Sequence, residues 1–339
     1  MNLHILSIFV TIKIEQIFHL APMLDIGRLI TYFLSFFLIW FGAGLIIKSV
    51  DKIAKSLHIG SFTVAFFILG LLTSIPETAI GINAVMDQKP EIFVGTLLGG
   101  SVVIFLLIIP LLALIGRGVR INHNLSAINL KIILVTIALP GLAVIDHKVT
   151  NLEGLALVIA YFVAIFTVQK QSGWLKTEQT QAFSQKAYSF IDLIKVALGI
   201  AFVIISSHNI VLQTIEYSNI LSIPSFYLSL LLLSIGSNLP ELSLAIQSVI
   251  SGKKDIAFGD YLGSAAANTL LFGIFTLANN GEVFTFNSFY VTLVFLVSGL
   301  VLFYIFSKSE RTISTKEGLI MLFIYVSFLA FEIYKGYVS

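Results

Sequence analysis

At residues 236–241 the chain reads Gly-Ser-Asn-Leu-Pro-Glu, inside an otherwise apolar run that extends from Tyr227 to Ile250. A run of this length and composition is typical of a membrane-spanning helix. Pro240 removes a backbone donor and clashes with the preceding turn, so we expect the helix to break there. A carboxylate at the bilayer centre costs about 2.5–3.5 kcal/mol even on the most lenient insertion scale. Glu241 is therefore a candidate functional residue.

The same element occurs a second time, as Leu-Thr-Ser-Ile-Pro-Glu at residues 72–77, in the apolar run from Phe62 to Val85. Its glutamate, Glu77, lies 164 positions before Glu241. The same offset, without gaps, continues through both regions and pairs Val85 with Val249, Lys89 with Lys253, Gly95 with Gly259 and Gly99 with Gly263. An ungapped register across two helices and their connection indicates an internal duplication.

The composition indicates an integral membrane protein. Of 339 residues, 57% are hydrophobic and only 11% are charged, and the mean hydropathy is +0.98. In a typical soluble domain about a quarter of the residues are charged. The net charge of +2 is too small to indicate a nucleic-acid partner, and the lack of cysteine excludes disulfides and thiolate metal sites. With no zinc-protease or phosphate-loop motif, the sequence favours neither an enzyme nor an ATP-driven pump.

Apolar segments near the length of a membrane span recur along the chain, five on each side of a polar linker. They are Leu29–Ile47, Phe62–Val85, Phe93–Leu114, Leu130–Ile145, Leu152–Val168, Leu193–Leu212, Tyr227–Ile250, Ile256–Leu277, Phe289–Phe306 and Leu319–Ile333. We therefore predict an all-α integral membrane protein with about ten transmembrane helices. Its parts are an N-terminal extension (1–28), a first five-helix repeat (29–168), a cytoplasmic linker (169–189) and a second five-helix repeat (190–339).

The basic residues of the connecting loops predict the orientation. Most of them, among which are Lys52, Arg117, Lys176 and Lys253, fall in alternate loops on the same side as the linker. The positive-inside rule then places the linker in the cytoplasm and both termini outside the cell membrane. Because each repeat has an odd number of spans, the repeats are predicted to be inverted, with the broken helices meeting at the midplane. That architecture is typical of secondary transporters.

The duplicated motifs resemble those of the sodium/calcium exchanger family of cation antiporters. The family signature is roughly Gly-Thr-Ser-Leu-Pro-Glu once in each half, followed by a helix that carries Asn, Ser and Asn or Asp at four-residue spacing. Residues 72–77 replace the first Gly by Leu and the Leu by Ile, and residues 236–241 replace Thr by Ser237 and Ser by Asn238. The resemblance implies exchange of Ca2+ for Na+ through a central site shared by Glu77 and Glu241.

The residues beside the two glutamates suit a hard cation. Ca2+ takes roughly six to eight oxygens from carboxylates, carbonyls and water. The broken helices would free carbonyls near Gly70 and Ser234. Hydroxyl and amide oxygens come from Thr73, Ser74, Ser237 and Asn238. An Na+ site needs the same kind of oxygens with less charge, so competition for shared glutamates would couple the two ions. No cofactor is predicted, and the expected partners are small inorganic cations and the lipid bilayer.

The helices that follow the two motifs differ in how many of the family's polar residues they keep. In the second half, three polar residues lie at helical spacing along one stripe: Asp260, Ser264 and Asn268. Their first-half counterparts are Thr96, Gly100 and Ile104, so the first half lacks two side-chain oxygens that the family usually has. We expect a lopsided site that binds fewer sodium ions, with Asp260 as a possible proton carrier. On this reasoning a serine at position 100 should steepen the sodium dependence.

Other functions compete with Na+-coupled exchange. A proton can be the counter-ion, with a glutamate or Asp260 protonated in the cycle, and Mn2+ or a similar ion can replace Ca2+. An intramembrane enzyme would use Glu77 and Glu241 as an acid/base pair, but the sequence offers no nucleophile, metal site or substrate-recognition element. The missing first-half oxygens also leave open a sensor that binds ions without transport. The sequence contains no indication of an oligomeric state.

Overall fold

The computed structural model describes residues 26–56, 70–120, 126–172, 190–221, 223–242, 246, 254–279, 282–284, 289–308 and 312–338. Several predictions from the sequence concern residues outside these ranges. They are the extension up to residue 25, most of the linker (173–189), the beginning of the second apolar run (62–69) and most of the end of the seventh run (243–245 and 247–250). Asp260 lies in a described helix, but its side chain lies outside what the structure describes.

The first half consists of helices joined by short connections. Its elements are α2 (Ile26–Ser56), α4 (Gly70–Thr73), α5 (Ile75–Met86), α6 (Pro90–Val103), the π-helical turn η3 (Ile104–Ile108), α7 (Ile109–Ile115), β1 (Val119–Arg120), α8 (Ala127–Ala143), β2 (Lys148–Val149) and α9 (Asn151–Ser172). The elements α6, η3 and α7 follow one another without a break.

The second half repeats this order. Its elements are α10 (Phe190–Leu221), α11 (Ser225–Leu228), the π-helical turn η4 (Ser229–Leu233), α12 (Ser234–Ser237), α14 (Lys254–Ala278), β3 (Val283–Phe284), α15 (Tyr290–Lys308), β4 (Thr312–Ile313) and α16 (Thr315–Val338). Residues 239–242 are again helical after α12.

The offset between the two glutamates extends over most of the chain. Three pairs of helix starts are each separated by 164 positions: Ile26 and Phe190, Pro90 and Lys254, and Asn151 and Thr315. The strands also correspond: adding 164 to β1 gives β3, and adding it to β2 gives β4. The duplication predicted from two short regions therefore describes the whole architecture.

The strands pair between the halves rather than within them. Strand β1 is antiparallel to β4, with Val119 opposite Ile313, and β2 is antiparallel to β3, with Val149 opposite Val283. Exchanging the halves maps each sheet onto the other, residue for residue, as a two-fold relation between the halves requires. The prediction of an all-α chain is wrong in this detail, because a strand of two residues leaves no alternating pattern in the sequence.

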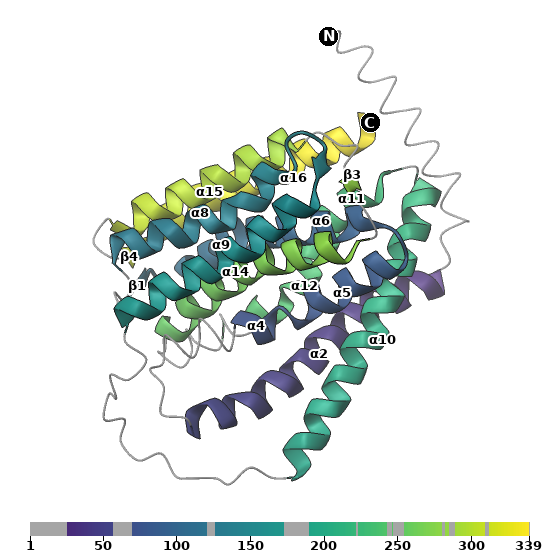
Figure 1. Cartoon of the computed structure of the whole chain (residues 1–339), viewed down its shortest axis with the longest axis horizontal. Coiled ribbons are helices and arrows are strands. Elements are labelled where there is room, and N and C mark those ends of the chain that lie inside the picture. Colours follow the sequence, from purple (N-terminus) through teal and green to yellow (C-terminus); the bar gives the residue numbers. More distant parts are fainter. Residues whose placement is uncertain are drawn as a thin grey trace.

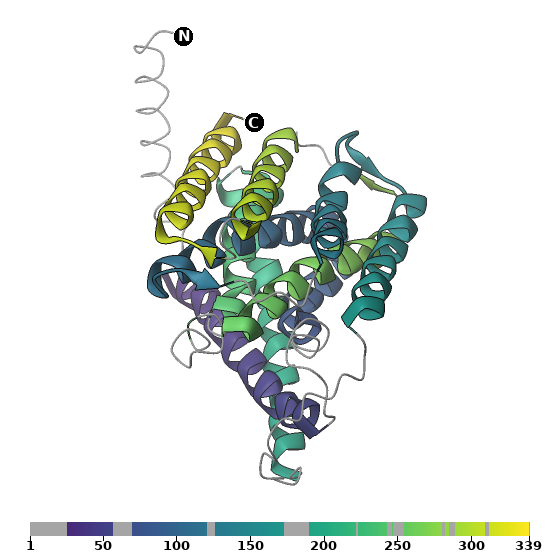
Figure 2. The same ribbon diagram turned by 90° about the vertical axis from the view of Figure 1, so that its left-hand side faces the viewer.

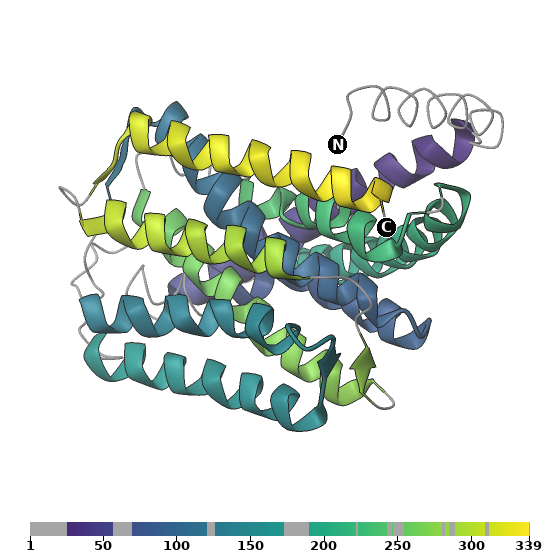
Figure 3. The same ribbon diagram turned by 90° about the horizontal axis from the view of Figure 1, so that it is seen from above.

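The helices are arranged in layers (Figure 1). Figure 3 shows α9, α8, α15 and α16 running side by side in one layer, and each helix contacts the next in that order. Helices α2 and α10 pack against each other on the opposite side of the molecule (Figure 2). Helices α6 and α14 and the broken segments lie between these two layers. The middle layer is therefore covered by helices from both halves.

Length and composition identify six candidate membrane spans among the described residues: Ile26–Leu45, Pro90–Ile115, Ile194–Leu221, Tyr261–Ala278, Tyr290–Lys308 and Thr315–Lys335. Two shorter apolar helices cover Ala127–Ala143 and Asn151–Thr167. The runs that contain the two glutamates are not in this set: each is interrupted by a helix break, and part of each lies outside the described residues. The protein is thus a helical, multi-pass membrane protein.

Both expected helix breaks are present. Helix α4 ends at Thr73, Ser74 adopts a turn, and α5 begins with Pro76 in its first turn. In the second half α12 ends at Ser237 and Asn238 adopts the turn. Proline lacks the amide hydrogen that a helix interior requires but fits the first turn, so each proline starts a new helical segment.

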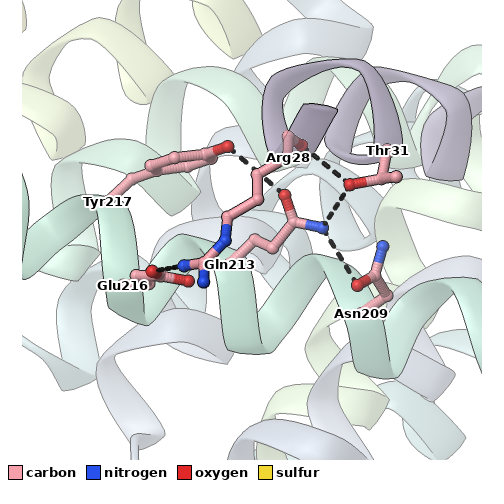
Figure 4. Close-up of polar contacts among 6 residues, drawn as sticks. All are labelled: Arg28, Thr31, Asn209, Gln213, Glu216 and Tyr217. Atoms are coloured by element: carbon pink, nitrogen blue, oxygen red, sulfur yellow. Dashed lines mark hydrogen bonds and ion pairs between the residues drawn. The ribbon is translucent and has the colours of Figure 1, made fainter. Parts of the chain in front are cut away.

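Polar side chains join α2 to α10 (Figure 4). Gln213 on α10 donates from Nε2 to Thr31 Oγ1 at 3.1 Å and to Asn209 Oδ1 at 2.9 Å. One turn nearer the start of α2, Arg28 forms an ion pair with Glu216. Gln213 is buried, and a buried polar side chain requires such partners. This interface therefore has a defined register along the two helices.

Candidate cation-binding site

Each helix break presents the same local arrangement of polar groups. In the first half Ser74 Oγ donates to the carbonyl of Gly70 at 2.8 Å. In the second half Asn238 Nδ2 donates to the carbonyl of Ser234 at 2.8 Å. The two carbonyls that the sequence predicts as freed oxygens thus accept side-chain bonds. Thr73 Oγ1 also donates to the Gly70 carbonyl at 3.3 Å, and Ser237 Oγ also donates to the Ser234 carbonyl at 3.5 Å, so each carbonyl oxygen already accepts two side-chain bonds.

The two glutamates lie in the first helical turn after each break and are fully buried. Glu77 is 1% exposed and Glu241 is 0% exposed. Asn238 Nδ2 donates to Glu77 Oε1 at 3.3 Å, and Ser264 Oγ donates to Glu241 Oε1 at 2.8 Å. Anions are stabilised at a helix N-terminus by its unpaired amides. The fold therefore holds both carboxylates where water does not reach them.

Hydroxyl contacts cross between the halves. Ser237 lies near the carboxylate of Glu77, and Thr73 lies near that of Glu241. Thr73 and Ser237 are counterparts at the offset of 164, so these two contacts are related by the exchange of halves. Ser74 Oγ and Ser264 Oγ are 3.4 Å apart. Each half thus contributes to the surroundings of the other half's carboxylate.

Asn268 extends the site toward α6. Its Nδ2 donates to the Leu97 carbonyl at 3.4 Å and to Ser101 Oγ at 3.5 Å. Both Asn268 and Ser101 are buried. Sequence reasoning missed Ser101, which lies one position beyond the stripe of Thr96 and Gly100. Its only signal is a hydroxyl in an otherwise apolar helix, and such a hydroxyl commonly bonds back to its own helix.

Four side-chain oxygens at the site are buried and have no hydrogen-bond partner: Oε2 of Glu77, Oε2 of Glu241, Oδ1 of Asn238 and Oδ1 of Asn268. A buried polar atom without a partner is costly, and a buried anionic oxygen is more so. All four are hard oxygens, two of them from carboxylates. A bound cation would satisfy them together, and this is the chemistry that the donor set supports.

The structure brings together ten of the eleven residues that the sequence proposes. Nine of them have buried side chains: Thr73, Ser74, Glu77, Ser234, Ser237, Asn238, Glu241, Ser264 and Asn268. Gly70 joins them through its carbonyl. Nothing is described for the side chain of Asp260. In the first half, Thr96 Oγ1 bonds to Ile92 O of its own helix at 2.7 Å, and Ile104 belongs to the apolar core.

Repeated halves, interrupted helices and paired buried carboxylates define a class of protein, the helical membrane transporters of ions. The family model described as sodium/calcium exchanger protein matches residues 28–169 and 192–334. The chain therefore belongs to the sodium/calcium exchanger family, and it is a membrane antiporter rather than an enzyme.

Curated relatives agree with this assignment. The chain is 24% identical over 339 aligned residues to the sodium/calcium exchanger MaX1 of Methanosarcina acetivorans, covering 86% of this chain and 95% of that protein. It is 24% identical to the putative antiporter CaxA of Alkalimonas amylolytica, covering 86% and 93%. The inner membrane protein YrbG of Escherichia coli is 25% identical over 258 residues, covering 71% and 79%.

A solved structure has the same fold. The sodium-calcium exchanger NCX_Mj, soaked with 2.5 mM Na+ and 1 mM Sr2+, superimposes with a TM-score of 0.66 at 19% sequence identity. The match covers 91% of this chain and 99% of that chain. The layered, two-half architecture is therefore that of a known antiporter.

Proposed function

We propose that the protein is a secondary-active antiporter that exchanges Ca2+, or a similar divalent cation, for Na+ by alternating access. The observation that carries the proposal is the meeting of Glu77 and Glu241. They come from equivalent positions in the two halves, both are buried, and each has one oxygen without a partner. A helix kink alone does not require a carboxylate, so the pair has a function beyond backbone geometry.

The ligand set fits a divalent cation. Two carboxylates balance the charge of Ca2+, and the amide oxygens of Asn238 and Asn268 complete part of a hard-oxygen shell. The hydroxyls of Thr73 and Ser237 lie against the carboxylates across the interface between halves. Na+ prefers the same oxygens with less charge, so it would compete with Ca2+ for the glutamates. Competition for shared ligands is what couples the two ions in this proposal.

The relatives support the same class of substrate. NCX_Mj was soaked with Na+ and Sr2+, and the name of MaX1 describes sodium/calcium exchange. In the second half, the hydroxyl of Ser264 donates to Glu241, and the amide of Asn238 donates to the hydroxyl of Ser237. A proton is the second candidate counter-ion, because protonation of one buried carboxylate would also displace a divalent cation.

For the membrane arrangement we propose ten crossings as two inverted five-helix repeats. The two interrupted runs and the two shorter apolar helices would then cross together with the six longer spans. An inverted repeat places the two-fold axis in the membrane plane, so the site lies near the midplane. The excess of Lys and Arg places residues 169–189 in the cytoplasm and both termini outside.

Radioactive calcium uptake into proteoliposomes tests the function. Under an imposed outward Na+ gradient we expect Ca2+ uptake that stops when the gradient is dissipated. Uptake that follows a pH gradient and ignores Na+ would assign H+ as the counter-ion. Calcium binding without uptake under any gradient would contradict antiport and identify an ion-binding sensor instead. Competition by Mn2+ and Sr2+ in the same assay ranks the divalent substrates.

A further inference from the structure

Two departures from the family pattern meet in space at the candidate site. The family usually has serine where this chain has Gly100, and it has serine where this chain has Asn238. The two positions are 138 residues apart, in different halves. A Cβ added to Gly100 would lie 3.0 Å from Asn238 Nδ2. Gly100 is thus smaller than the serine of the family pattern, and its neighbour Asn238 is larger than the serine of that pattern.

The space above Gly100 is filled by amides. The same Cβ would lie 3.1 Å from Asn268 Nδ2, so any side chain at position 100 displaces one of two asparagines. Asn238 cannot withdraw freely, because its Nδ2 donates to Ser234 O at 2.8 Å and to Glu77 Oε1 at 3.3 Å. Cβ contacts this short are rare in well-packed interiors, and relieving them requires the neighbour to move.

We propose that Gly100 and Asn238 form one specificity-determining unit, in which the second half supplies the neutral oxygen that the first half has lost. This inference rests on the proposed function and identifies how this chain builds its site. The glycine provides room, and the asparagine reaches across it to Glu77. One oxygen of Glu77 then faces an amide donor, and Oε2 of Glu77 and Oδ1 of Asn238 face the cation.

The unit has a consequence for the glutamate. The amide donor occupies one lone pair of Oε1 and leaves Oε2 without a partner, so Asn238 holds the Glu77 carboxylate in place with Oε2 available to the cation. On this proposal Gly100→Ser weakens cation binding and does not steepen the sodium dependence. The added side chain would press on Asn238 and Asn268 rather than extend the ligand set.

A four-member cycle tests the unit: the wild type, Gly100→Ser, Asn238→Ser and the double variant. Purified protein in nanodiscs is assayed for equilibrium binding of radioactive calcium and for thermal stability without divalent cations. We expect each single variant to bind Ca2+ about tenfold more weakly or worse, and the double variant to return to within about threefold of the wild type. Gly44→Ser is the control for the serine, because nothing lies within 4 Å of a Cβ at Gly44.

Additive losses in the double variant would overturn the proposal, as would a Gly100→Ser protein with wild-type affinity. If Gly100→Ser cannot be purified, recovery of folded, Ca2+-binding protein by adding Asn238→Ser supports the unit, and failure to recover contradicts it. A wild type that binds no Ca2+ would instead refute the proposed function. The stability measurements still report the steric coupling between the two positions in that case.

Discussion

At the scale of single residues, burial decides what the two glutamates can do. Glu77 and Glu241 are enclosed by the protein, and in each one carboxylate oxygen has a donor and the other has none. Glu332 also has one unpartnered buried oxygen, but Glu77 and Glu241 have theirs in one site with the unpartnered amide oxygens of Asn238 and Asn268, where an empty site is expensive. These residues therefore sacrifice folding stability for a site that a cation can complete.

Glutamine at either position should abolish calcium transport. Glu77→Gln and Glu241→Gln keep the size of the side chain and remove one of two negative charges. A unit charge about 4 Å from a cation contributes about 4 kcal/mol at an effective dielectric constant of about 20, and twice that for a divalent ion. We expect uptake at background and binding weakened by at least about a hundredfold.

Glu332 provides the matched control for these variants. It is also a fully buried glutamate, it accepts a hydrogen bond from Thr292 Oγ1 at 2.7 Å, and it lies in α16 outside the site. Glu332→Gln keeps an oxygen for Thr292 and should transport Ca2+ like the wild type. Near-normal transport by Glu77→Gln or Glu241→Gln, at unchanged protein level, would contradict a shared site.

At the scale of elements, close contact between α6 and the broken helix of the second half positions the site. A Cβ at Gly99 would lie 2.4 Å from the carbonyl of Leu230 in η4, and one at Gly95 would lie 2.7 Å from the carbonyl of Phe226. Glycines at this spacing let helix backbones approach closely in membranes. Here they set the distance between α6 and the segment that carries Ser234.

Gly99→Ala should destabilise the protein and impair transport together. The added methyl group meets backbone rather than a flexible side chain, so η4 must shift, at a cost of about 1–3 kcal/mol. Thermal unfolding in detergent, with Ca2+ uptake, measures both effects. Gly44→Ala should unfold no earlier than the wild type, because its surroundings are open and alanine favours a helix by about 0.5–1 kcal/mol. Equal melting temperatures for the two variants would refute this account of the interface.

The sequence identified those residues whose presence in a membrane helix costs energy and has no explanation in packing. A proline and a carboxylate inside an apolar run, twice at one offset, define both breaks and the core of the site. It did not identify the π-helical turns η3 and η4, because an extra residue in a helical turn has no residue signature. The contact between Gly100 and Asn238 was also inaccessible, since it depends on how the two halves pack. The sequence therefore predicts which residues form each helix break, but it does not predict the distances between residues of different halves.

At the scale of the whole molecule, the proposed orientation in the membrane rests on the asymmetry of basic residues. Single cysteines are informative because the chain contains none. In intact cells, Ser339→Cys at the C-terminus should react with an impermeant thiol reagent from outside. Ser184→Cys in the linker should react only after the membrane is permeabilised. Labelling of Ser184→Cys from outside would reverse the proposed topology.

The crossed pairing of the strands means that neither half is complete by itself. Strand β1 has its partner in β4, and β2 has its partner in β3. Helix α9 of the first half also packs on α14 of the second, and α16 of the second packs on α7 of the first. The chain thus resembles an intertwined dimer whose two subunits have been fused. If the gene is cut within residues 173–189, each fragment should be degraded when it is made alone. Made together, the two fragments should assemble into one transporter.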